Sequence, residues 1–164
     1  MDKILLRRIR LMILFYIAAV LVSGITAFPL PWEVSILVRW FGEGTVIGTH
    51  LPSLADWLAR VKEGLDSNSQ LYPFIAYGTD WLAFAHIVIA LAFVGPLCYP
   101  IKNRWVIRWG MLCCVGIIPL VLICGAIRGI PWGWQCVDCS FGVFGIIPLI
   151  LIDRWTRQLQ ALSC

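Results

Sequence analysis

The sequence is poor in charged residues. Only 13% of its 164 residues are Asp, Glu, Lys or Arg, about half the fraction of a typical soluble domain, whereas 60% are hydrophobic. A soluble fold of this length cannot cover so much apolar surface, and apolar residues arranged in long runs are typical of membrane proteins. The composition therefore argues against a soluble domain and predicts an integral membrane protein.

The chain also lacks the common sequence motifs of catalysis. We find no glycine-rich phosphate loop, no nucleophile elbow, no H-E-x-x-H and no acyl-transfer triad. Only two histidines are present, His50 and His86, so a b-type haem has few candidate axial ligands. No basic stripe falls on a soluble face, and we therefore expect no nucleic-acid partner.

Four apolar runs are candidate membrane spans, against the usual need for about 20 apolar residues to cross a bilayer. The last run is the shortest and must extend back toward Trp132 to reach that length. The pattern predicts an all-α membrane protein, one integral domain over residues 1–164, built as a four-helix bundle. The expected spans are at about 9–28, 81–99, 106–127 and 134–152.

Residues 30–78 form the one long connection in the chain, between the first two spans. The stretch Trp32–Phe41 predicts a short amphipathic helix in the headgroup plane, broken by the glycines that follow, as far as Gly48. A second amphipathic helix is predicted just beyond, with Ser53 as its N-cap and a polar turn at residues 66–70. We expect an amphipathic, partly helical outer loop that acts as a lid or as a passive collar.

The positive charges predict an orientation. With the N-terminus in the cytoplasm, nine of the 13 Lys and Arg residues fall on the cytoplasmic side. This bias follows the positive-inside rule, so we expect both termini to be cytoplasmic and the protein to lie in a bacterial inner (cytoplasmic) membrane. Tryptophans near both ends of the spans are typical of aromatic belts.

His86 falls inside the second span, and Asp80 lies at its start. A titratable side chain inside a span is costly and needs a partner, a cavity or a function. His86 is either a buried base or ligand, or the donor of a hydrogen bond within the helix bundle. Asp80 either orients His86 or only interacts with the helix dipole.

The connection between spans three and four contains Cys136-Val-Asp-Cys139. Two such cysteines at, or just before, a helix N-terminus favour thiolate chemistry, and the expected outer compartment is one where disulfides persist. Arg128 precedes them and either pairs with Asp80 or Asp138, as part of a cofactor site, or extends alone to the membrane surface. The pattern predicts a thiol-redox site that faces outward.

An outward-facing C-x-x-C that opens the last helix of a four-span bundle resembles the vitamin K epoxide reductase and DsbB-type thiol–quinone oxidoreductases. The resemblance covers the span number, the topology and this motif. It implies a quinone cofactor and Cys136 and Cys139 as the redox pair. Those families use a second cysteine pair, whereas residues 30–78 hold no cysteine. The phrases YGTDWLAFAHIVIA and RGIPWGWQCVDCSFGVFGIIPL also resemble those of small bacterial four-span membrane proteins.

Three functions stay open. The first is thiol redox chemistry with a quinone. The second is a non-catalytic membrane subunit or scaffold of a larger complex, in which stability responds to packing at Gly116 or Gly145. The third is a metal or haem site, for which the ligand types are right. The residues available as metal ligands are Cys136, Cys139 and His86, with Asp80 or His50.

The expected partners follow from these alternatives. The lipid bilayer is a partner in every case. A quinone, a membrane-complex partner and further copies of the chain stay open.

Overall fold

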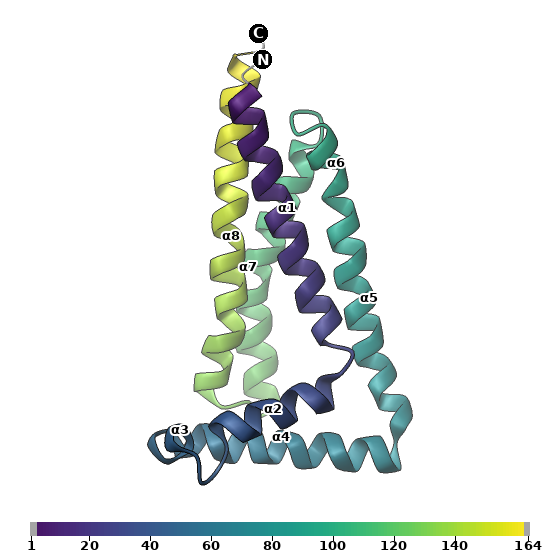
Figure 1. The fold of residues 1–164 in the computed structure, drawn as a ribbon, viewed down its shortest axis with the longest axis vertical. Coiled ribbons are helices and arrows are strands. Elements are labelled where there is room, and N and C mark those ends of the chain that lie inside the picture. The colour runs from purple at the N-terminus through teal and green to yellow at the C-terminus, as the bar shows by residue number, and fades with distance from the viewer. Residues whose placement is uncertain (1–2, 163–164) are drawn as a thin grey trace. The chain divides into compact units, whose positions relative to one another are not determined.

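The computed structural model describes residues 3–162, and the regular elements in that range are helices (Figure 1). In chain order they are α1 (Lys3–Thr26), α2 (Leu30–Phe41), α3 (Val46–His50), α4 (Pro52–Leu71), the 3-10 helix η1 (Pro73–Ala76), α5 (Tyr77–Ala92), α6 (Val94–Cys98), α7 (Arg104–Ile127) and α8 (Trp132–Ala161). The predicted all-α fold is confirmed.

Four helical segments are long and apolar enough to cross a membrane. They are Lys3–Thr26, Pro73–Cys98, Arg104–Ile127 and Trp132–Ala161. The four predicted spans are therefore confirmed in number, and each predicted range overlaps one of these segments; the chain is an integral membrane protein. The fourth is longer than predicted: α8 has 30 residues, which corresponds to about 45 Å of helix, because its polar last turns continue the helix beyond the apolar run.

The chain forms two compact units. The described parts of residues 1–21 and 88–164 make up the first unit, and residues 22–87 make up the second. Helices α1 and α5 each contribute to both units. The single domain expected over residues 1–164 stays a prediction.

The first unit holds a continuous hydrophobic core. Leu5, Ile9 and Ile13 recur every four residues along one face of α1 and are buried. They share the core with buried side chains of α7 and α8, which pack side by side in Figure 1. Proline lies inside both of these helices, at Pro119 and Pro148. The remaining buried members of the core are Phe93, Val106, Ile107, Cys114, Leu149, Ile152 and Leu159.

The second unit is built on the packing of α2 against α4. Val34 of α2 and Ala55 and Leu58 of α4 are buried, while Trp32 and Trp40 are about two-thirds exposed. The two amphipathic helices predicted for residues 30–78 are therefore confirmed. The structure adds the short helix α3 between them.

Two details of this loop differ from the prediction. Gly48 does not end a helix but lies inside α3, whose first turn is capped by Thr45: the Thr45 Oγ1 accepts a hydrogen bond from the Gly48 N–H at 2.9 Å. Ser53 is not an N-cap, because α4 already begins at Pro52. Proline suits the first helical position, where the missing N–H costs nothing, and Leu51 takes the N-cap position without a side-chain bond.

The polar turn predicted at residues 66–70 is also wrong, since α4 continues to Leu71. Lys62 and Asp66 form an ion pair one helical turn apart, which favours the helical conformation at this point. The side chains of Asp, Ser and Asn can bond to the nearby backbone and so favour turns. Here the ion pair favours the helix instead.

Candidate functional site

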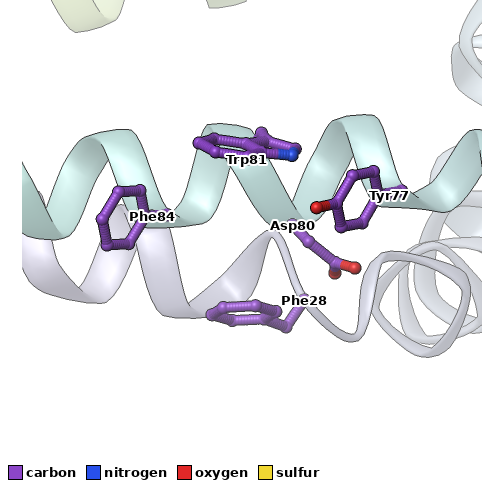
Figure 2. A pocket seen from close by; sticks show the side chains of 5 residues that line it. All are labelled: Phe28, Tyr77, Asp80, Trp81 and Phe84. Atoms are coloured by element: carbon purple, nitrogen blue, oxygen red, sulfur yellow. The ribbon is translucent and has the colours of Figure 1, made fainter.

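Asp80 lies in an aromatic cleft of the second unit (Figure 2). The cleft encloses about 320 Å³ and is lined by Phe28, Tyr77, Asp80, Trp81 and Phe84. Spacing on α5 explains it, since residues 77, 81 and 84 recur at helical intervals and share one face. Phe28 comes from the link between α1 and α2.

The rings of this cleft are ordered against one another. Tyr77 and Trp81 lie edge to face with ring centroids 6.0 Å apart, and Trp81 and Phe84 do so at 5.9 Å. In Figure 2 the carboxylate of Asp80 lies between the side chains of Tyr77 and Phe28. Aromatic faces beside a carboxylate attract an organic cation, and the same faces can stack on a planar ring.

His86 bonds to its own helix. Its Nδ1 lies 2.8 Å from the carbonyl oxygen of Leu82, one turn earlier on α5. A carbonyl only accepts, so Nδ1 carries the proton, and in a neutral ring Nε2 is then the acceptor. The Leu82 carbonyl thus holds this ring nitrogen, and an orienting role for Asp80 stays a prediction. The ring is half-buried.

The backbone of α1 passes directly against His86. A methyl group at Gly24 would lie 2.5 Å from the His86 Cβ and 3.1 Å from the Ala83 carbonyl oxygen, closer than van der Waals contact allows. Ala83 is fully buried at this point. Gly24 thus permits α1 and α5 to approach closely.

Cys136 and Cys139 are both unpaired thiols on α8. Cys136 is exposed and Cys139 is half-buried. The sequence places the pair at, or just before, the start of the helix. In the structure α8 already begins at Trp132, after Pro131, so both cysteines lie beyond its first turn. The effect of a helix N-terminus fades within that turn, so its contribution to thiolate chemistry is smaller than expected.

Sequence reasoning missed the residue that fixes the turn before this pair. Gln135 is buried, and its Nε2 donates a hydrogen bond to the Ile130 carbonyl oxygen at 2.8 Å. Its side chain also packs on Gly125 of α7, where a methyl group would lie 2.6 Å from the Gln135 Cδ. The only sequence signal is a lone glutamine at the start of an apolar span.

The turn itself has a defined geometry. Gly129 has φ of +66°, its N–H donates to the Ala126 carbonyl, and the Ile130 N–H donates to the Gly125 carbonyl at 2.9 Å. These two bonds make a Schellman motif at the end of α7. Arg128 stands at the C-cap with an exposed side chain, and within residues 3–162 it forms no ion pair with Asp138. Its pairing with Asp80 stays a prediction, because the two residues belong to different units.

The strongest polar cluster was also missed, and it lies at the opposite end of α8. Asp153 is 3% exposed and accepts a two-point interaction from Arg104, with Nε to Oδ1 at 2.6 Å and Nη2 to Oδ2 at 3.2 Å. Arg157 donates to Asp153 Oδ2 from Nε at 2.9 Å and from Nη2 at 2.8 Å. Arg108 is a more distant partner at 3.6 Å.

The predicted metal ligands do not form a cluster within the described residues. Among residues 3–162, no group of three His, Cys, Asp or Glu side chains is close enough together to hold a metal ion. His50 ends α3 and is exposed. A site that combines the two cysteines with His86 stays a prediction, because these residues belong to different units.

Comparisons with protein-family models, with curated proteins and with solved structures found no match to this chain. The resemblance to thiol–quinone oxidoreductases therefore rests on the span number and on the C-x-x-C.

Proposed function

We propose that this membrane protein is a dithiol oxidoreductase in which Cys136 and Cys139 alternate between two thiols and a disulfide. The supporting observation is a pair of unpaired thiols on one helix, three residues apart, one of them exposed. Oxidation forms one S–S bond and releases two electrons and two protons. A quinone dissolved in the bilayer accepts the two electrons and the two protons and becomes the hydroquinone.

The helix sets a condition on this reaction. Side chains three residues apart on a helix have Cβ atoms about 5–6 Å apart, whereas a disulfide needs Cβ atoms about 3.5–4.5 Å apart. The start of α8 must therefore unwind locally when the disulfide forms. Gly133 lies in this segment, and a methyl group added to it would meet open space. The conformational freedom of glycine favours such a change. Oxidation is expected to reduce the helix content of residues 132–139.

The deciding experiment traps thiols in intact cells with a membrane-permeant and an impermeant alkylating reagent, followed by peptide mass spectrometry. The proposal expects a reversible Cys136–Cys139 disulfide that responds to quinone supply, and reduced Cys136 that reacts with the impermeant reagent. Cys124, an exposed lone cysteine on α7, is the internal control. Two thiols that stay reduced and alkylate freely would overturn the proposal, and thiols that react only after a chelator is added would favour the metal alternative.

A non-catalytic membrane subunit is the second candidate. The observation that favours it lies on α2, where Trp32 and Trp40 are each about two-thirds exposed. Large exposed aromatic residues on an amphipathic helix suit contact with lipid or with a partner protein. Under this alternative the exchanges Cys136→Ser and Cys139→Ser leave the behaviour of the protein unchanged, whereas Trp40→Ala weakens its membrane complex.

A further inference from the structure

A second cleft lies in the first unit. It encloses about 390 Å³, between the start of α1, the turn from α6 to α7, and the end of α8. Its lining residues are Leu6, Arg10, Cys98, Tyr99, Pro100, Ile101, Lys102 and Leu159. The lining is mainly apolar and carries two cations and no carboxylate.

One wall of this cleft is held in place by hydrogen bonds. Arg10 donates from Nε to the Leu97 carbonyl oxygen at 3.2 Å and from Nη2 to the Cys98 carbonyl oxygen at 3.4 Å. Asn103 donates from Nδ2 to the carbonyl oxygens of Gly95 at 3.0 Å and Tyr99 at 3.1 Å. These bonds provide partners for carbonyl groups at the end of α6 that the helix itself leaves open.

The two cations face the cleft with donors to spare. Arg10 uses two of the five N–H groups of a guanidinium on these carbonyls. The Lys102 Nζ lies 5.8 Å from the centre of the Tyr99 ring, a cation–π contact that leaves its ammonium protons available. Both side chains are exposed.

The charge around the cleft has one sign. The basic end, meaning the start of α1, the α6–α7 turn with the start of α7, and the end of α8, carries nine Lys and Arg residues. Of the acids there, Asp153 is the one within the described range, and its carboxylate already pairs with arginines. The nine cations are Lys3, Arg7, Arg8, Arg10, Lys102, Arg104, Arg108, Arg154 and Arg157.

We propose that this cleft binds an anionic phospholipid, with its phosphate between Arg10 and Lys102 and one acyl chain along Leu6, Ile101 and Leu159. Basic pockets between membrane helices suit anionic headgroups, and the apolar lining suits a hydrocarbon chain. A free phosphate ion would satisfy the two cations and leave the apolar part of the cleft unused. The combination therefore favours a lipid over a soluble anion.

The test is native mass spectrometry of the purified full-length protein, titrated with phosphatidylglycerol or phosphatidylcholine. We expect phosphatidylglycerol to bind the more tightly. Lys102→Gln should weaken that binding by about fivefold, the effect of one lysine beside an anionic headgroup. Arg154→Gln is the matched control, because Arg154 is an exposed cation of α8 outside the cleft.

Three results would overturn the proposal. Equal binding of the two lipids removes the role of charge. Equal losses in Lys102→Gln and Arg154→Gln point to a general attraction to the basic end. Displacement of the lipid by millimolar inorganic phosphate identifies the cleft as a site for a soluble anion. Arg10→Lys separates folding from binding, since it keeps the charge while removing the two-carbonyl interaction, and a folded variant should retain most of the lipid.

Discussion

Gly24 and His86 are in direct contact. The backbone of α1 passes so close to α5 that a side chain at position 24 would overlap the His86 Cβ. His86 itself bonds to Leu82 of its own helix, so its Nδ1 needs no partner from α1. The contact is one of shape, in which the small residue lets the two helices approach. A histidine inside a span is thus accommodated by a glycine, and the satisfied Nδ1 reduces the cost of burying its ring.

The first prediction is that Gly24→Ala destabilises the protein. The added methyl group would lie 2.5 Å from the His86 Cβ, so the helices must move apart, at a cost of about 1–3 kcal/mol. The measurement is the thermal unfolding midpoint in detergent. Gly116→Ala is the matched control, because a methyl group there meets no side chain and no neighbouring helix within 4 Å. Equal midpoints for the two variants would mean that α1 and α5 are not in contact.

Gly116 also shows what sequence can predict of packing. The sequence Gly-Ile-Ile-Pro-Leu begins at both Gly116 and Gly145. In the structure, however, a methyl group at Gly116 meets open space and one at Gly145 meets the Cys114 Sγ at 3.2 Å. Identical local sequence does not fix which face of a helix meets a neighbour, because that depends on residues far away in the chain.

Asp153 explains a different failure of sequence reasoning. Counting charges by membrane side predicts an orientation, but it treats Arg104, Arg157 and Asp153 as independent surface groups. The pairing of Arg104 with Asp153 joins residues 49 positions apart, so no local pattern contains it. The spacing of Asp153 and Arg157, four residues along a helix, is the one part of the cluster that the sequence could have supplied.

The second prediction concerns this cluster. Asp153→Asn should lower the free energy of unfolding by about 3–5 kcal/mol, because Arg104 then loses its charged acceptor at a nearly buried position. Arg108→Gln should cost at most about 1 kcal/mol, since Arg108 is 58% exposed and its distance to Asp153 is long. Chemical denaturation in detergent micelles gives both values. Similar losses in the two variants would show that the carboxylate is not the centre of the cluster.

The third prediction is that Gln135→Ala loosens the start of α8. It removes the bond to the Ile130 carbonyl and the packing on Gly125, a loss of about 1–3 kcal/mol. Because Cys136 is the next residue, its alkylation rate should rise severalfold, whichever function the thiols serve. The rate is measured by mass spectrometry over time. Gln158→Ala, an exposed glutamine of the same helix, should leave it unchanged, and equal rates in both variants would contradict a fixing role for Gln135.

Some features of the cysteine pair can be predicted from the sequence, whereas others appear only in the structure. The spacing of Cys136 and Cys139 is visible in the sequence, as is their position near the beginning of the last span. The exact start of α8 is not, because Pro131 both ends the preceding turn and admits a helix directly after it. The buried contact of Gln135 with Gly125 is equally hidden, since it forms only when α7 and α8 pack.

The fourth prediction tests the turn that precedes the pair. Gly129→Ala should destabilise the protein by about 1–2 kcal/mol, because φ of +66° crowds the Cβ of any other residue. Gly133→Ala should be neutral or stabilising by up to about 1 kcal/mol, since it lies in the first turn of α8 with nothing within 4 Å and alanine favours the helix. The two variants add the same methyl group four residues apart, so the difference between their unfolding midpoints isolates the backbone conformation.

If oxidation of Cys136 and Cys139 requires the start of α8 to unwind, Gly133→Ala should also slow disulfide formation. An unchanged rate would mean that the disulfide forms without loss of that helix.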